Sequence, residues 1–322
     1  MALLELEGVG KEFPIRGRRE KLRAVDDVTL SVIEGETLGL VGESGCGKST
    51  LARCIVGLQP PTEGIVRFDG ADLSGLRGSA RKSARRDLTM VFQDPYSSLN
   101  PRRRVIDVVA APLDIQGLAR GADRRRQVDE MLELVGLEPA HASRYPHEFS
   151  GGQRQRIGIA RALITKPRLL VCDEPVSALD VSIQAQILNL LVGLREELGL
   201  TLVFIAHDLG VIRHISQRIA VMYMGRIVEI AETDQLFAQP IHPYTEGLLA
   251  AVPVPDPTRH VDDDQLLSGD VPLASAPPGG CAFHPRCSYA IERCSNEQPV
   301  LDDSDGKQHP AACFCPLSSA AQ

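Results

Sequence analysis

No stretch of this sequence is apolar for long enough to cross a membrane as a helix. Such a helix needs roughly 18 or more consecutive apolar residues, whereas the best candidate, Leu198 to Ala206, is typical of a buried strand with its lead-in. We also expect no signal peptide, because the first residues, MALLELEGVGKEF, are acidic where such peptides are basic. Both absences predict a cytoplasmic protein whose thiols stay reduced.

An excess of positive charge is missing too. The chain has 35 Lys and Arg against 42 Asp and Glu, a net charge of −7, so we expect no nucleic-acid partner. We interpret the arginine-rich runs at 81–86, 102–104 and 124–126 first as solvated faces and second as surfaces for partners. The 322 residues are enough for one large α/β domain and a smaller second one.

The most informative stretch is GESGCGKST, which fits the phosphate-binding pattern G-x-x-x-x-G-K-[ST]. Glycines let the backbone close around phosphate, Lys48 can reach the β- and γ-phosphates, and the Ser49 hydroxyl can ligate Mg²⁺. The alternative is a chance glycine-rich turn, which a predicted strand at 36–41 and a predicted helix at 51–58 disfavour. The predicted nucleotide-binding residues are Gly42, Glu43, Ser44, Gly45, Cys46, Gly47, Lys48, Ser49 and Thr50.

A second anion-binding helix start is predicted at SGGQRQR, residues 150–156. Ser150 is a typical N-cap residue, and the glycines that follow it leave backbone N–H groups open toward an anion. The chain therefore contains two separate segments suited to phosphate.

Two further predicted strands end in polar residues. The apolar segment RLLVCDEP, residues 168–175, ends in Asp173 and Glu174, and the strand at 202–206 precedes His207. At the carboxyl edge of a parallel sheet, Asp173 can hold Mg²⁺ and Glu174 can deprotonate a water. The alternatives are a solvated turn for the two acids and a structural role for the histidine.

The remaining pattern predicts the rest of an α/β protein. Strands are expected at 3–9, 28–33, 65–68 and 88–92, with a hairpin at 219–230 around Met224-Gly225-Arg226. Helices are expected at 181–198 and 242–251, with a helical region at 105–135. The segments at 11–23 and 93–101 are predicted to be loops, and 77–86 a basic linker. From residue 253 the composition changes to proline and aspartate, which predicts a linker into a cysteine-rich extension.

Taken together, these motifs resemble those of the ATPase subunits of ABC transporters over nearly the whole chain. GESGCGKST resembles the Walker A loop, LLVCDEP the Walker B strand, and SGGQRQR the ABC signature. The resemblance assigns the Q-loop to Gln93, the signature to Ser150, Gly151, Gly152 and Gln153, the D-loop to a segment ending at Asp180, and the switch histidine to His207. Phe13 occupies the place of the adenine-stacking aromatic, although by itself it is equally typical of a core or turn position.

Longer segments are similar to the dipeptide/oligopeptide and nickel importer ATPases in particular. They include MVFQDPYSSLNPR, DEPVSALDVSIQAQILNLL and HPYTEGLLAAVP, while FSGGQ and PPGGCAFHPRC resemble the second of the two paired subunits. The fold implied is a P-loop NTPase with a RecA-like core, a helical subdomain at about 94–165 and an N-terminal antiparallel β subdomain. The implied domains are an ATPase at 1–252 and a linker with a Cys-rich extension at 253–322.

The resemblance also implies a mechanism and partners. ATP would lie on Lys48, Ser49 and Thr50, with Mg²⁺ on Ser49, Gln93 and Asp173, while residues 150–153 would cover the ATP of a homologous partner ATPase. Glu174 would orient the attacking water and His207 would sense the γ-phosphate. Further partners would be two transmembrane permease subunits and an extracytoplasmic solute-binding protein, with this chain on the cytoplasmic face of the membrane. The alternatives are import of nickel or another solute, a non-transport ABC ATPase, and a metal-binding or redox module with an attached ATPase.

Five of the eight cysteines lie near the C-terminus. Cys281, Cys287, Cys294 and Cys313 are separated by 5, 6 and 18 residues, and Cys315 follows. Disulfides are disfavoured in a reducing cytosol, zinc sites usually contain closer cysteine pairs, and buried thiols alone would leave a small segment with little core. The similar tails of dipeptide/oligopeptide importer ATPases imply a [4Fe–4S] cluster on these four cysteines, with Cys315 as a spare or substitute ligand.

Overall fold

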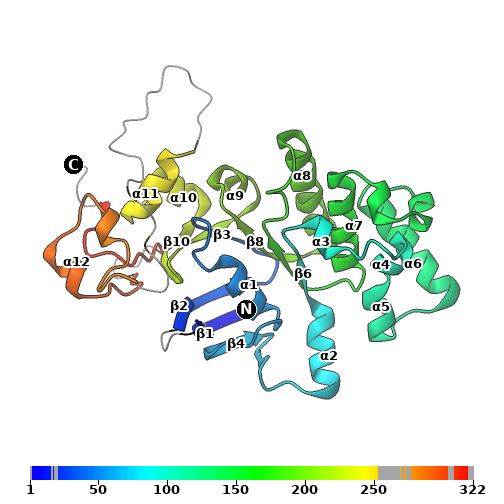
Figure 1. Ribbon diagram of the computed structural model, residues 1–322, viewed down its shortest axis with the longest axis horizontal. Coiled ribbons are helices and arrows are strands. Elements are labelled where there is room, and N and C mark those ends of the chain that lie inside the picture. Colours follow the sequence, from blue (N-terminus) through cyan, green and yellow to red (C-terminus); the bar gives the residue numbers. More distant parts are fainter. Residues whose placement is uncertain are drawn as a thin grey trace. The chain divides into compact units, whose positions relative to one another are not determined.

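The computed structural model describes residues 2–15, 17, 21–252, 269, 272, 277–303 and 308–317. The chain forms two compact units, whose elements are labelled in Figure 1. The first contains residues 1–4, 32–36 and 67–205, and the second contains 5–31, 37–66 and 206–322. The predicted domain boundary at residue 253 falls at the start of a segment outside the described residues, so it stays a prediction.

Three parallel strands form the sheet of the first unit. They are β6 (Leu88–Val91), β7 (Leu169–Asp173) and β8 (Thr201–Ala206), with Cys172 of β7 facing Val91 and Phe204. Every residue of β7 and β8 is buried, as continuous apolar runs in a parallel sheet require. Because the strands are parallel, the residues that follow β6 and β7 emerge at one edge.

Helices make up most of the rest of the first unit. They are α2 (Gly78–Asp87), α3 (Pro95–Ser98), α4 (Val105–Val109), α5 (Ala111–Gln116), α6 (Gly121–Leu134), α7 (Gly151–Leu163) and α8 (Val181–Leu198), with 3₁₀ turns at Pro139–Ser143 and Pro146–Glu148. The predicted helix at 181–198 is confirmed. None of the described helices is long and apolar enough to cross a membrane.

Several predictions for this unit were wrong in detail. The basic linker expected at 77–86 is helix α2, because Ala, Arg and Lys are good helix formers whatever their charge. The predicted helical region at 105–135 is confirmed and consists of three helices, since Pro112 falls in the first turn of α5 and Gly117 ends that helix with φ +68°. The loop expected at 93–101 contains the one-turn helix α3, whose first turn Asp94 caps.

Charged strands occupy much of the second unit. They are β1 (Ala2–Pro14), β2 (Lys21–Ile33) and β4 (Glu63–Phe68), which are neighbours in the order β2-β1-β4. The last two residues of β4, Arg67 and Phe68, belong to the first unit and pair there antiparallel with β5 (Ala71–Asp72). The loop predicted at 11–23 was therefore too long. Of its described charged residues, Lys11 and Glu12 lie on β1 and Lys21 and Arg23 lie on β2, and Lys21 donates to Glu12 at 2.8 Å.

A second group of strands in this unit carries the phosphate-binding loop. Strand β3 (Thr37–Val41) runs parallel to β9 (Arg218–Tyr223), and β9 forms an antiparallel hairpin with β10 (Arg226–Glu232). The predicted hairpin is confirmed. Met224 and Gly225 connect its strands, and both have positive φ, as a tight two-residue turn requires.

The helices of the second unit are short. They are α1 (Lys48–Ile55), α9 (Leu209–Ile215), α10 (Thr233–Ala238), α11 (Pro243–Ala250) and α12 (Glu292–Asn296), with a 3₁₀ turn at His284–Arg286. The sequence did not predict α9 or α10, each of which has only six or seven residues. Helix α1 begins at Lys48, so the end of the phosphate-binding motif is already helical.

The described part of the tail, residues 277–303 and 308–317, packs on β9, β10 and α11. Phe283 is buried, with its ring 5.3 Å from that of Tyr223 and 5.4 Å from that of Tyr244. Glu229 of β10 has no exposed surface, accepts the backbone N–H of His242, and lies 2.6 Å from the ring of His309. The tail is thus attached through a buried aromatic cluster and a buried polar one.

We expect this attachment to weaken in acid because of His242. Burial lowers the pKa of His242 to about 4, and its Nδ1 accepts the backbone N–H of Tyr244. A lowered folded-state pKa means that the unfolded chain binds the proton better, so stability is lost as the pH falls from about 6.5 toward 4. The loss should approach about 3 kcal/mol at the lower limit. Urea unfolding at pH 7 and pH 5 should show it, and His242→Gln should reduce the pH dependence.

Candidate functional site

The loop between β3 and α1 approaches other backbone so closely that it depends on two glycines. A Cβ on Gly42 would lie 2.1 Å from the carbonyl oxygen of Met222, and one on Gly47 would lie 2.1 Å from that of Ala24. Gly47 also has φ +109°, in the region that favours glycine. The loop 42–47 therefore has the glycine-dependent backbone expected of a phosphate cradle.

Lys48 places its charge inside this loop. Its side chain is 3% exposed, and Nζ donates to the carbonyl oxygens of Gly42 at 2.7 Å and Glu43 at 2.9 Å. Burial raises the pKa of the neighbouring Cys46 thiol, an effect that the Lys48 charge opposes. Lys48 is thus an ordered cation at the start of α1, and Cys46 is kept in its protonated, weakly nucleophilic form.

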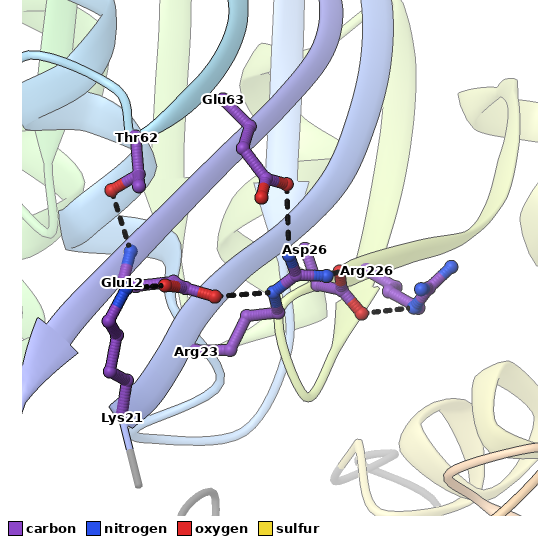
Figure 2. Close-up of polar contacts among 7 residues, drawn as sticks. All are labelled: Glu12, Lys21, Arg23, Asp26, Thr62, Glu63 and Arg226. Atoms are coloured by element: carbon purple, nitrogen blue, oxygen red, sulfur yellow. Dashed lines mark hydrogen bonds and ion pairs between the residues drawn. The ribbon is translucent and has the colours of Figure 1, made fainter. Parts of the chain in front are cut away.

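An ion-pair network fixes the strand end that carries Phe13. Arg23 donates to Asp26 at 2.6 Å and to Glu63 at 2.9 Å, while Arg226 of the β9–β10 hairpin donates to the other oxygen of Asp26 (Figure 2). Glu12, which precedes Phe13, accepts a hydrogen bond from Lys21 and donates its backbone N–H to the Thr62 hydroxyl, and dashed lines mark both contacts in Figure 2.

The same network reaches the phosphate-binding loop through backbone groups. Asp26 donates its N–H to the carbonyl of Gly225, and Gly225 donates to the carbonyl of Cys46. The strand end with Phe13, the hairpin turn and the loop are therefore held in a fixed arrangement within one unit.

In the other unit, the parallel sheet brings Gln93 and Glu174 together. Gln93 follows β6 and Glu174 follows β7, and Gln93 Nε2 donates to Glu174 Oε2 at 2.8 Å. Asp173 and Glu174 are buried. Glu174 has φ +45°, which is uncommon outside glycine and indicates a backbone constrained by its surroundings. Two of the predicted catalytic residues thus form a direct contact.

The predicted N-cap at Ser150 is confirmed. Its hydroxyl accepts the N–H of Gln153, and the Gln153 side chain accepts the N–H of Ser150, which together form a capping box. A Cβ on Gly152 would lie 2.6 Å from a methyl group of Ile183, so small residues are needed here. Arg154 lies over the ring of Tyr96 in α3, at 4.3 Å from its centroid. The glycine-rich helix start is therefore rigid and well formed.

The remaining predicted residues occupy suitable positions in their own units. His207 is exposed and follows β8 directly, and Asp180 is the N-cap residue of α8. Phe13, the loop 42–50 and His207 belong to the second unit, whereas Gln93, Ser150, Gly151, Gly152, Gln153, Asp173, Glu174 and Asp180 belong to the first.

Two family models match this chain. A model of the ABC transporter family matches residues 25–177, and one of the oligopeptide/dipeptide transporter C-terminal region matches residues 228–294. The chain is 50% identical to the oligopeptide transport ATP-binding protein OppF of Salmonella typhimurium, over 97% of this chain and 96% of that protein. It belongs to the ATP-binding subunits of oligopeptide/dipeptide ABC transporters.

Another relative and a solved structure are also similar to this chain. The chain is 53% identical to the probable peptide ABC transporter ATP-binding protein y4tS of Sinorhizobium fredii, over 99% of this chain and 92% of that protein. Among solved structures, it is similar to the dimeric ATP-binding cassette MJ0796 bound to ADP and Pi, with a TM-score of 0.65 and 34% identity, over 71% of this chain and 98% of the other. The P-loop fold of an ABC ATPase is therefore confirmed.

The Walker A loop of this ABC ATPase has two partners that no sequence motif predicts. Arg286 in the tail donates to both carboxylate oxygens of Glu43, at 2.7 and 3.0 Å, and the Tyr244 hydroxyl accepts the Glu43 N–H at 2.9 Å. Arg286 is 243 positions away from Glu43, and no motif joins them. Only the segment PPGGCAFHPRC, which contains Arg286, could have drawn attention to this part of the chain.

The tail thiols lie close enough to influence one another. Burial raises the pKa of Cys287 to about 11 and that of Cys313 to about 12. The nearby thiols of Cys281 and Cys315 raise both pKa values further, because thiolates repel one another. Cys315 also interacts directly with the Cys294 side chain. In the described part of the chain, however, no three His, Cys, Asp or Glu side chains are arranged to hold a metal ion. The tail thiols thus affect one another's pKa values, but among the described residues they do not form a metal-ligand geometry.

Proposed function

We propose that this chain hydrolyses ATP to power the import of oligopeptides or dipeptides through an ABC transporter. The observation that carries the proposal is the match over 97% of the chain to an oligopeptide transport ATP-binding protein, in a sequence with intact Walker A, Walker B and signature motifs. The C-terminal region typical of oligopeptide/dipeptide transporters supports the peptide assignment.

The roles of the residues follow from their chemistry. Lys48 and the N–H groups of the glycine-dependent loop bind the phosphates of ATP, and Phe13 stacks on adenine. Glu174 accepts a proton from the attacking water, and its contact with Gln93 orients the carboxylate at 2.8 Å. His207 donates a hydrogen bond to the γ-phosphate, so that it distinguishes ATP from ADP.

The oxygen atoms of Ser49, Gln93 and Asp173 suit Mg²⁺, which prefers hard oxygen ligands. Gln93 uses its amide N–H groups toward Glu174, which leaves the amide oxygen for the ion. When bound, Mg²⁺ neutralises charge on the transferring phosphate.

We propose that the signature residues act on a second ATP, held by a homologous partner ATPase. The supporting feature is the capped, glycine-rich start of α7, whose backbone N–H groups suit an anion. Asp180 at the start of α8 lies close in sequence to Glu174 and completes this surface. Two permease subunits and an extracytoplasmic binding protein would complete an importer, with this chain at the cytoplasmic face of the membrane.

Uptake by cells tests the function. Deletion of the gene should abolish uptake of labelled di- to pentapeptides, and the wild-type gene should restore it while the Glu174→Gln variant does not. Nickel and amino-acid uptake serve as controls. Loss of nickel uptake with normal peptide uptake would contradict the peptide assignment.

We further propose that the tail thiols carry a [4Fe–4S] cluster, with Cys281, Cys287, Cys294 and Cys313 as ligands. The support is that four cysteines and Cys315 occur in a segment with few large apolar side chains, where neighbouring thiols affect the pKa values of Cys287 and Cys313. Because their pKa values are raised, these two thiols hold their protons, and metal binding would have to displace them.

Anaerobically purified protein should then be brown and contain about four iron and four sulfide per chain. Cys287→Ser should remove both, whereas Cys54→Ser, which changes a buried cysteine in α1, should not. Colourless protein with about one zinc per chain would contradict the cluster and support zinc instead.

A further inference from the structure

The tail contacts the phosphate-binding loop through Arg286. Arg286 lies on the 3₁₀ turn His284–Arg286, and its guanidinium forms a bidentate pair with the Glu43 carboxylate at 2.7 and 3.0 Å. The Arg286 side chain is only 4% exposed, and that of Glu43 is 24% exposed. A two-point pair this well shielded is far more specific than an ordinary surface ion pair.

Aromatic side chains build the site that holds this arginine. The Arg286 guanidinium lies 5.9 Å from the ring centroids of both Tyr223 and Phe283, and the Tyr223 ring lies 4.6 Å from that of Tyr244. Tyr244 in turn accepts the backbone N–H of Glu43. The side chain and the backbone of Glu43 are therefore both held, one by the tail and the other by α11.

The position of Glu43 gives this pair its importance. It is the second residue of the loop, its carbonyl oxygen accepts from Lys48, and it carries a negative charge in a segment that must bind anionic phosphates. An unpaired carboxylate here would repel ATP and compete for the Lys48 ammonium. The Arg286 guanidinium neutralises it and, through two hydrogen bonds, fixes the direction of the side chain.

We propose that Arg286 is a positioning residue for ATP binding, which neutralises and orients Glu43 so that the Walker A loop accepts the phosphates. The inference rests on the proposed binding of ATP by this loop. It assigns to the tail a part in the nucleotide site that does not depend on what the cysteines hold.

A double-mutant cycle on the full-length chain tests this role. Arg286→Met keeps most of the side-chain volume but leaves Glu43 unpaired, so we expect ATP to bind about 10- to 100-fold more weakly. The loss should be larger for ATP than for AMP, because the repulsion grows with the charge of the nucleotide, and it should shrink at high salt. In the double variant Glu43→Gln/Arg286→Met the negative charge at position 43 is absent, so ATP affinity should return to within about threefold of that of the wild type.

The control is Arg293→Met, which changes another tail arginine, paired with Glu297 and 56% exposed, and should leave ATP affinity unchanged. If Arg286→Met bound ATP as wild type does, or if the double variant were as weak as the single one, the proposal would be overturned. If Arg286→Met does not fold, the double variant alone tests the proposal. ATP binding by the double variant that is about tenfold weaker than that of the wild type would mean that Arg286 serves only to dock the tail, and would overturn the proposal. Absence of ATP binding by the wild type would instead contradict the proposed function itself.

Discussion

Replacing Glu174 with glutamine is expected to leave ATP binding intact and to reduce ATP turnover at least about 100-fold. The amide cannot accept the proton of the attacking water at neutral pH. Its oxygen can still accept the hydrogen bond that Gln93 now donates to Glu174, so the shape of the site should be kept. Turnover is measured on the purified complex with its membrane subunits, and binding by titration with a fluorescent ATP analogue.

The matched control for this change is Glu196→Gln. Glu196 lies on α8 with a side chain that is 67% exposed, and the same chemical change there should leave turnover at the wild-type rate. Near-normal hydrolysis by the Glu174 variant would show that another group accepts the proton.

Lys48→Ala is expected to have its largest effect on nucleotide binding itself. It removes a buried ammonium that now donates to two carbonyl oxygens of the loop. With ATP bound, the ammonium would donate to phosphate oxygens instead. Each hydrogen bond lost there is worth about 1.5–3 kcal/mol, which predicts ATP binding weakened roughly 10- to 150-fold or more. Equilibrium titration of the isolated subunit measures the change.

Ser150→Arg provides the contrast, because Ser150 is not part of the loop that holds this chain's ATP. We expect it to preserve ATP binding by the isolated subunit but to block ATP-dependent pairing, measured by size-exclusion chromatography with the partner ATPase. Ser150→Ala is its control, since it removes only the N-cap of α7, at a cost of about 0.5–2 kcal/mol in stability. Equal loss of ATP binding in Lys48→Ala and Ser150→Arg would contradict the two-surface model.

The features that could be predicted from the sequence depend on short stretches of chain. The loop at 42–50, the Ser150 cap and the hairpin around Gly225 each involve residues within a few positions of one another, so their chemistry is visible locally. Helix α8 was predicted because it is long and periodic.

The features that were missed depend on distant partners or on charge. Helix α2 and the strand ends near Glu12 and Lys21 are rich in charged residues, and such segments are easily taken for loops. The strand ends are recognised only when the charged partner on the opposite strand is known. Burial of Glu229 beneath His309 and the pairing of Glu43 with Arg286 join residues 80 and 243 positions apart. No periodicity within a window of the chain can reveal such contacts.

The distance between Glu43 and Arg286 along the chain has a consequence for synthesis. A ribosome adds about 5–20 residues per second, so Arg286 is made roughly 12–50 s after the loop that it contacts. During that interval the nascent Walker A loop carries an uncompensated carboxylate, and a chain truncated before the tail carries it permanently. The proposed nucleotide site is therefore completed only after Arg286 has been made, and chains that end before it should compete poorly for ATP.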